Sequence, residues 1–199
     1  MTHTPVHRDT KIQRSGRRDL GIFVSMFFRR STTLLFVFFS LLLLSCEEAD
    51  EDFPRTEVNF NCNLQQAPYS FITTPGQFLT ITKKGSSYTV EYPGQPAYIG
   101  GEWKVFLGFG GLILGQPVLS MDVSSQYAAY DRGCPVEAAD LVISRLNINT
   151  NREGTCPKCK TVYDLDTGFP KSGVGKERLK TYTVHTTSTN TGTGLTVRN

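Results

Sequence analysis

The chain has 199 residues, of which 39% are hydrophobic and 20% are charged, and its formal net charge is +3 at pH 7. This length is sufficient for one domain with a single hydrophobic core. The positive charge lies in residues 1–45, which hold seven of the 21 Lys and Arg residues and two of the 18 Asp and Glu residues. The rest of the chain is slightly acidic, which argues against nucleic acid as a partner.

An export signal is predicted in residues 1–45. Arg29 and Arg30 precede an apolar run at 32–44, and small residues follow before Cys46. A basic segment, a short apolar segment and small residues before a cleavage point are typical of a secretory signal. The run of ~13 residues is too short to cross a bilayer comfortably, and an uncleaved membrane anchor is the alternative. Residues 1–25 would make an unusually long basic segment, so we expect Met26 to be the initiator.

The end of this signal, Leu-Leu-Ser-Cys, resembles the bacterial lipoprotein signal. The resemblance implies that Cys46 becomes the lipidated N-terminus and that a lipid anchor holds the protein at a membrane of the cell envelope, at the outer membrane or cell surface. Residues 46–56 contain the run Glu-Glu-Ala-Asp-Glu-Asp, which we interpret as a solvated tether. The run is also similar to the acidic signal that sorts some Gram-negative lipoproteins to the cell surface, so both interpretations stay open.

Residues 57–199 are predicted to form one all-β domain. Short alternating or β-branched runs are separated by Pro-Gly, Gly-Gly and Thr-Gly turns. This pattern is typical of an antiparallel sandwich or barrel. The glycine-rich run 106–115 is expected to be part of a buried strand with a bulge. In chain order, the expected strands are 57–64, 77–83, 87–92, 104–114, 118–123, 126–130, 141–149, 161–164, 180–186 and 195–198.

A small loop subdomain is expected to interrupt this domain at about 134–160. In this interpretation residues 57–133 and 161–199 form the main sheet, and two loops in the insertion flank a strand pair. The polar stretch 186–194 is expected to be a hairpin loop.

Three cysteines form the candidate site. Cys134 lies in Tyr-Asp-Arg-Gly-Cys-Pro, and Cys156 and Cys159 lie in Cys-Pro-Lys-Cys. Two thiols three residues apart, with a third from an upstream loop, can converge on one metal ion or cluster. A structural zinc ribbon would need a second Cys-x-x-Cys, which the sequence lacks. The sequence also lacks the common hydrolase, phosphate-loop and metalloprotease motifs, so we expect no catalytic site in this chain.

The order of motifs around these cysteines resembles the Rieske iron–sulfur domain. That family has a Cys-x-His box, then a Cys-x-x-His box followed by an aromatic-Asp pair, then glycine turns and a Leu-x-x-Tyr-x-Val segment. Cys134 and Cys156 match the two cysteines of the boxes. The positions that match the downstream pattern are Tyr163, Asp164, Gly168, Gly173, Leu179, Tyr182 and Val184. The resemblance implies a Rieske-like β fold with a cluster-binding loop subdomain, and electron transfer through a [2Fe–2S] cluster to a protein redox partner.

The ligand positions depart from the family pattern. Val136 stands in place of the first histidine and Cys159 in place of the second, so the site offers three thiolates and an unknown fourth ligand. Glu137 and Cys62 are the candidates for that ligand. Cys62 alternates with apolar residues on one strand face and is otherwise a core cysteine, and Glu137 is otherwise a solvated loop carboxylate. His185 is expected to be an exposed strand residue.

Three states of the site stay open from the sequence. It could hold a [2Fe–2S] cluster with atypical ligation, or zinc or another ion on three cysteines. It could also hold no metal, with the thiols free or joined in a disulfide. Export favours the last state, because a chain that is exported unfolded cannot carry a preassembled cluster. Without a cluster the protein would be a structural or binding lipoprotein with an unknown surface partner.

Overall fold

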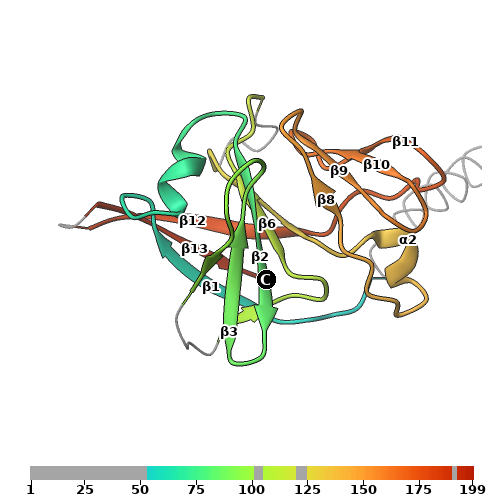
Figure 1. Cartoon of the computed structure of the whole chain (residues 1–199), viewed down its shortest axis with the longest axis horizontal. Coiled ribbons are helices and arrows are strands. Elements are labelled where there is room, and N and C mark those ends of the chain that lie inside the picture. Colours follow the sequence, from blue (N-terminus) through green and yellow to red (C-terminus); the bar gives the residue numbers. More distant parts are fainter. Residues whose placement is uncertain (1–52, 101–104, 120–124, 190–191) are drawn as a thin grey trace, which may run out of the picture. The chain divides into compact units, whose positions relative to one another are not determined.

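The computed structural model describes residues 53–100, 105–119, 125–189 and 192–199, which form an almost entirely β structure (Figure 1). All of them belong to one unit, Asp50–Asn199. The predicted signal, Met26, the lipidation site Cys46 and most of the tether at 46–56 lie outside the described residues. Within the described ranges, no helix has the length and apolar character that crossing a membrane requires.

The larger of two sheets contains nine of the described strands. In spatial order these are β4 (Tyr98–Ile99), β3 (Ser87–Glu91), β2 (Phe78–Lys84), β6 (Leu112–Gly115), β7 (Ala128–Asp131), β12 (Thr181–Thr189), β13 (Gly192–Arg198), β1 (Val58–Asn63) and β5 (Phe106–Leu107). Every neighbouring pair is antiparallel. Strands β1, β12 and β13 run across the direction of β2, β3 and β6 (Figure 1). The predicted all-β, antiparallel class is therefore confirmed.

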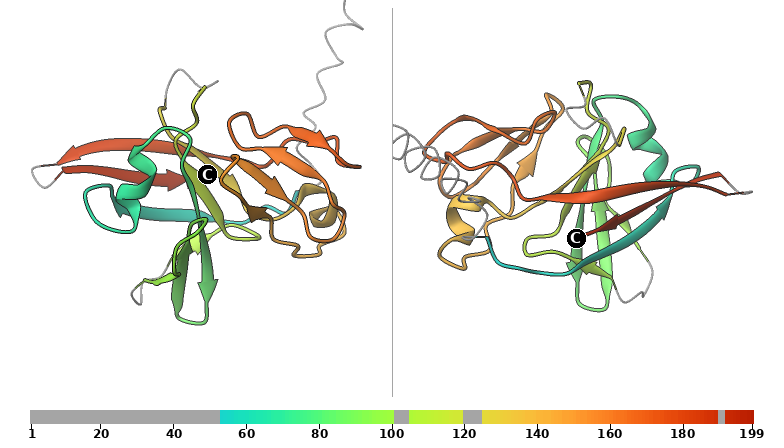
Figure 2. Two further views of the ribbon diagram at one scale, coloured as in Figure 1. Left: turned by 45° about the horizontal axis from the view of Figure 1, so that its top comes forward. Right: turned by 180° about the vertical axis from the view of Figure 1, so that it is seen from behind.

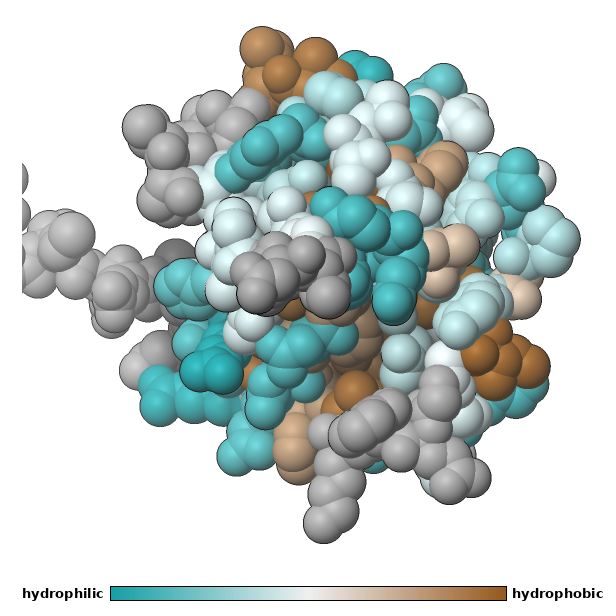
Figure 3. All heavy atoms as spheres, turned by 90° about the vertical axis from the view of Figure 1, so that its left-hand side faces the viewer, coloured by the Kyte–Doolittle hydropathy of each residue, from teal (hydrophilic) through white to brown (hydrophobic). Residues whose placement is uncertain are grey.

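The larger sheet encloses a hydrophobic core to which both groups of strands contribute. Phe60 of β1 and Val197 of β13 belong to the same buried cluster as Leu79 of β2 and Leu114 of β6. The 3₁₀ helix η1 (Tyr69–Thr73) adds Ile72, which is fully buried. Alternate residues of each strand point to one face, which places these side chains on the inner face of the sheet. The face of the molecule in Figure 3 is mostly hydrophilic or neutral, with hydrophobic residues exposed in separate spots.

The smaller sheet has four described strands in the order β11 (Pro170–Ser172), β10 (Val162–Asp164), β9 (Glu153–Thr155) and β8 (Asn147–Ile148). It lies to one side of the larger sheet in the left view of Figure 2. The strand pair expected between the two cysteine loops is β8–β9. The sheet extends beyond the expected end at about residue 160, because β10 pairs with β9 and β11 rather than with the larger sheet.

A second hydrophobic cluster joins the two sheets. It contains Phe78 and Ile113 from the larger sheet together with Tyr163 and Leu165 from the smaller sheet and the turn that follows it. Two of the three site cysteines are part of the same cluster. The site is therefore built on packing between the sheets and not on an isolated surface loop.

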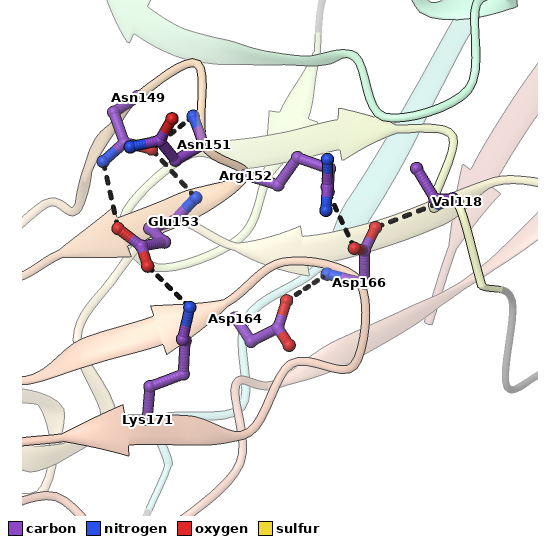
Figure 4. A network of polar contacts seen from close by, with 8 residues as sticks. All are labelled: Val118, Asn149, Asn151, Arg152, Glu153, Asp164, Asp166 and Lys171. Atoms are coloured by element: carbon purple, nitrogen blue, oxygen red, sulfur yellow. Dashed lines mark hydrogen bonds and ion pairs between the residues drawn. The ribbon is translucent and has the colours of Figure 1, made fainter.

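Polar side chains connect the strands and turns of the smaller sheet (Figure 4). Lys171 donates to Glu153 at 2.6 Å, and Arg152 donates to Asp166 at 2.7 Å. The same Asp166 accepts a hydrogen bond from the backbone N–H of Val118 at 3.0 Å, which links this sheet to the chain after β6. The strands of this sheet have only two or three residues and bury little apolar surface, so such polar contacts help to hold them in place.

The prediction of one strand at 104–114 is wrong for its described part. The structure divides it into β5, which pairs with β1, and β6, which pairs with β2 and β7. Gly108 and Gly111 have φ values of +77° and +109° in the turn between them, a conformation that favours glycine. A Cβ at Gly111 would lie 2.7 Å from the carbonyl oxygen of Ile81. The glycines therefore mark a turn between two strands and not a bulge within one.

Other expected elements differ in extent. The polar stretch 186–194 is mostly strand, because β12 continues to Thr189 and β13 begins at Gly192. Of the expected strand 141–149, only the two residues of β8 form a strand. Residues 118–119 are a bend, and 120–124 lie outside the described residues. The strands β4 and β11 were not predicted, and β9 was expected only as an unbounded member of the strand pair. These strands are only two or three residues long, too short for an alternating pattern.

Candidate metal centre

The structure brings the three predicted cysteines together. Cys134 lies directly before the short helix α2 (Pro135–Ala138), and Cys156 and Cys159 lie in the turn between β9 and β10. Their Sγ atoms all lie within 4.8 Å of one another, and those of Cys134 and Cys159 are 3.5 Å apart. Cys134 and Cys156 have 0% exposure, whereas Cys159 is partly exposed. The convergence predicted from the spacing is therefore present.

The Cys-Pro-Lys-Cys turn has a tight backbone that directs both sulfurs to one side. The N–H of Lys160 donates to the carbonyl of Cys156 at 3.1 Å, and the N–H of Cys156 donates to the carbonyl of Thr161 at 2.9 Å. Lys160 has a φ of +63°, which closes the turn at a sterically costly position. This geometry is held by the flanking strands β9 and β10, which pair with each other.

The loop that carries Gly173 and Gly175 packs directly on this turn. The N–H of Gly175 donates to Oγ1 of Thr161 at 3.0 Å, and the same hydroxyl lies 3.2 Å from the Cys159 sulfur. A Cβ at Gly173 would lie 2.5 Å from the Cα of Thr161. A side chain at Gly173 would therefore displace the residue that contacts Cys159.

Burial and hydrogen bonds give the buried thiols Cys134 and Cys156 different pKa values. Burial raises the pKa of Cys134 to about 12, and Tyr163 Oη lies 3.9 Å from its sulfur. Burial also opposes ionisation of Cys156, but hydrogen bonds from Ser144 and from backbone N–H groups in the turn outweigh it and lower its pKa. The Ser144 hydroxyl lies 3.3 Å from the Cys156 sulfur. Cys156 is therefore the thiol that ionises more readily of these two.

The expectation that Glu137 is a solvated loop carboxylate is wrong. Glu137 is only 6% exposed, because Pro135 starts helix α2 immediately after Cys134 and the first turn faces the Cys-Pro-Lys-Cys loop. Its carboxylate forms an ion pair with Lys158 of that loop, and this pairing raises the pKa of Lys158. Glu137 does not belong to the group of donor atoms within 4.8 Å that the cysteines form.

Three other positions singled out by the sequence lie outside the group of converging donor atoms. Val136 packs against the inter-sheet cluster, and a Cβ at Gly175 would lie 3.0 Å from its Cγ2. It therefore stands beside the site and offers no donor atom. Cys62 lies in β1 opposite Leu195 and packs against the core of the larger sheet. The structure does not bring Cys62 to the other cysteines, and burial raises its pKa to about 12. His185 is exposed, as expected.

Asp131 is a supporting residue that the sequence analysis missed. It is fully buried at the end of β7 and accepts hydrogen bonds from the backbone N–H groups of Phe109, Gly110 and Gly133 at 2.7, 2.8 and 2.6 Å. Burial raises its pKa, while these bonds and one from Tyr182 oppose that shift. The only signal in the sequence is an aspartate at the end of the apolar run Tyr-Ala-Ala-Tyr, directly before Arg-Gly-Cys. Three of its donors, Phe109, Gly110 and Tyr182, are more than twenty residues away in the sequence, so their identity could not be predicted.

The donor set fits one metal ion and does not fit a binuclear cluster. A [2Fe–2S] cluster in a Rieske domain divides two cysteines and two histidines between two irons. Here three sulfurs converge within 4.8 Å, and the side chain in place of the first histidine, Val136, has no donor. Three thiolates around one point match the first three ligands of a tetrahedral site for a thiophilic ion.

Comparisons with known proteins add little to this description. No protein-family model and no curated protein matches the chain. A solved structure from Mycobacterium tuberculosis, assigned as the small subunit of an NADH-dependent nitrite reductase, is similar over 72% of this chain and 96% of that chain, with 13% sequence identity and a TM-score of 0.31. The fold class and the site follow from the geometry of the described residues.

Proposed function

We propose that this chain is an exported, lipid-anchored protein of the cell envelope whose β domain binds one thiophilic metal ion through Cys134, Cys156 and Cys159. The observation that carries the proposal is the convergence of the three sulfurs within 4.8 Å. Zinc is the ion that best suits the donors, because it accepts several thiolates without a redox change.

The sulfur spacing is compatible with such an ion. Zinc–sulfur bonds of about 2.3 Å in a tetrahedron place the sulfurs about 3.8 Å apart. The separation of 3.5 Å between Cys134 and Cys159, and the limit of 4.8 Å for the group, lie on either side of that value. Binding would therefore require only small movements of side chains that are already packed.

Three protein ligands leave a fourth coordination position. Cys159 is the partly exposed member of the group, so this position is expected on the side from which solvent reaches the sulfurs. One carboxylate oxygen of Glu137 is engaged by Lys158, so this residue is not a free ligand for that position. We infer that the bound ion stabilises the smaller sheet and presents an open position to water or an external ligand, which is a structural or binding role.

The envelope location is supported by the sequence alone. The apolar run at 32–44, the Leu-Leu-Ser-Cys ending and the acidic stretch after Cys46 form the pattern of a lipid-anchored protein. In this proposal the lipid on Cys46 anchors the protein in the membrane and residues 46–56 separate it from the domain. Electron transfer through a [2Fe–2S] cluster would need donors for a second iron, which the described residues of the site do not offer.

Metal titration of the full chain tests the proposal. The protein would be purified in detergent, stripped with a chelator and titrated with zinc(II) against a competing chelator, and with cobalt(II) as an optical probe of thiolate ligation. We expect one ion per chain, loss of binding in Cys156→Ser, and unchanged binding in the matched control Cys62→Ser. Equal binding by the two variants would refute the assignment of the ligands.

A further inference from the structure

We propose that, in the metal-free protein, Cys134 and Cys159 are a redox pair that closes into a disulfide and so withdraws two of the three ligands. The consequence for metal binding rests on the proposed function, whereas the pairing itself rests on the geometry of the thiols.

The distance between the two sulfurs supports this pairing. The Sγ atoms of Cys134 and Cys159 are 3.5 Å apart, and a disulfide bond is about 2.05 Å long. The Cys156 sulfur instead contacts the hydroxyl of Ser144 at 3.3 Å, a residue on the segment between α2 and β8. Cys156 also interacts with the Cys134 thiol, but part of its hydrogen bonding goes to Ser144. The pairing is therefore assigned from the 3.5 Å contact between the sulfurs of Cys134 and Cys159.

Exposure decides which thiol reacts first. Cys134 and Cys156 are fully buried, and Cys159 is partly exposed in the turn. An oxidant in solution reaches Cys159 before the other two. The buried partner at 3.5 Å then resolves the first product without any need for solvent access to Cys134.

The chemistry is thiol–disulfide exchange with a small disulfide, R–S–S–R, as the oxidant. The Cys159 sulfur loses its proton and attacks one sulfur of R–S–S–R, whose S–S bond breaks, and the leaving thiolate takes up a proton to give R–SH. The Cys134 thiol then attacks the Cys159 sulfur and passes its proton to the departing thiolate, which leaves as the second R–SH. Its fixed position 3.5 Å from that sulfur offsets its raised pKa. Two protein thiols are oxidised to one disulfide, and one small disulfide is reduced to two thiols.

The disulfide and the metal ion exclude each other. A sulfur in a disulfide has no thiolate to donate, so only Cys156 would remain as a ligand. Conversely, a bound ion holds both sulfurs as ligands and lowers their availability to the oxidant. The site would therefore bind metal under reducing conditions and lose it under oxidising ones.

Disulfide mapping of the full chain tests the pairing. The detergent-purified, chelator-stripped protein is treated with oxidised glutathione, denatured, alkylated and digested for mass spectrometry. We expect one cross-link between the peptides of Cys134 and Cys159, with Cys156 alkylated. Cys134→Ser should stop at a glutathione adduct on Cys159, and Cys62→Ser should behave as wild type. A cross-link between Cys156 and Cys159, or a persistent adduct in wild type, would overturn the proposal.

Two further readouts separate this inference from the proposed function. Zinc added before the oxidant should slow the cross-link at least tenfold, and a protein that binds no zinc would contradict the metal site while leaving the mapped pairing intact. If Cys134→Ser does not fold, the wild-type time course replaces it. The glutathione adduct should then appear on Cys159 before the cross-link, and its first appearance on Cys156 would contradict the proposed order.

Discussion

Tyr182 donates its hydroxyl hydrogen to the buried carboxylate of Asp131 at 2.7 Å. Tyr182 lies on β12 and Asp131 ends β7, so the bond ties a long strand of the larger sheet to the segment that enters the cysteine site. The same carboxylate accepts the N–H of Gly133, the residue directly before Cys134. Asp131 thus connects the framework of the domain to the position of the first ligand.

Replacing Asp131 by Asn should destabilise the domain strongly. The Asn amide would direct N–H groups at backbone donors that the carboxylate now satisfies, which costs about 3 kcal/mol of unfolding free energy. Tyr182→Phe removes one donor and should cost about 1–2 kcal/mol. Urea unfolding followed by circular dichroism measures both values. An Asp131→Asn variant as stable as wild type would show that this carboxylate does not hold the segment.

A histidine at position 136 should supply the missing fourth ligand. Val136 lies beside the cysteine cluster on α2, so an imidazole there would complete a tetrahedral set. Zinc affinity should rise at least about tenfold in Val136→His, equivalent to about 1.4 kcal/mol. Competition with a chromophoric chelator measures the change, with Val136→Leu as the apolar control. The same affinity in both variants would place the open coordination position elsewhere.

The Glu137–Lys158 ion pair should show coupling between its two members. Lys158→Met leaves a buried carboxylate without its cation, so the melting temperature should fall. Adding Glu137→Gln removes that buried charge, and the double variant should melt at a higher temperature than Lys158→Met alone. Thermal unfolding of the two single variants and the double variant provides the comparison. A double variant less stable than both single variants would argue against the pair.

Cys62 should be nearly inert in the folded protein. Burial raises its pKa from 9.0 to about 12, so its thiolate fraction at pH 8 falls roughly a thousandfold and alkylation slows by a similar factor. Below pH 9 the thiol is protonated in both states, and its contribution to the unfolding free energy is fully present. As the pH rises from 9 toward 12 only the unfolded chain releases the proton, so this stability is lost. Peptide-resolved iodoacetamide labelling at pH 8, with and without urea, tests the first point. Equal rates in both conditions would contradict the burial.

The same pH dependence can be isolated by comparison with Cys62→Ala. The difference in unfolding free energy between wild type and this variant should be constant from pH 6 to 8. Above pH 9 the unfolding free energy of wild type should fall relative to that of the variant. The reason is that the unfolded chain then releases the thiol proton while the folded chain retains it. A difference that stays constant to pH 11 would show that the folded-state pKa is not raised.

Local patterns in the sequence predicted the convergent cysteines and the longer strands. The spacing of Cys156 and Cys159 directs two sulfurs to one side of a turn, and alternation identified β1, β2 and β3. Burial and turn geometry that depend on residues far away in the sequence could not be predicted. The burial of Glu137 depends on Lys158, and the turn at Gly108 depends on Asp131, more than twenty residues along the chain. Very short strands such as β9 have no period to detect.

Elemental analysis of the native protein tests the central claim most directly. The full chain, purified anaerobically in detergent from its own cells, would be assayed for metals by plasma mass spectrometry and for acid-labile sulfide. The account predicts one zinc ion per chain and no labile sulfide. It also predicts that Cys156→Ser loses the ion and that Cys62→Ser retains it. Two irons and two sulfides per chain, or no bound metal at all, would contradict it.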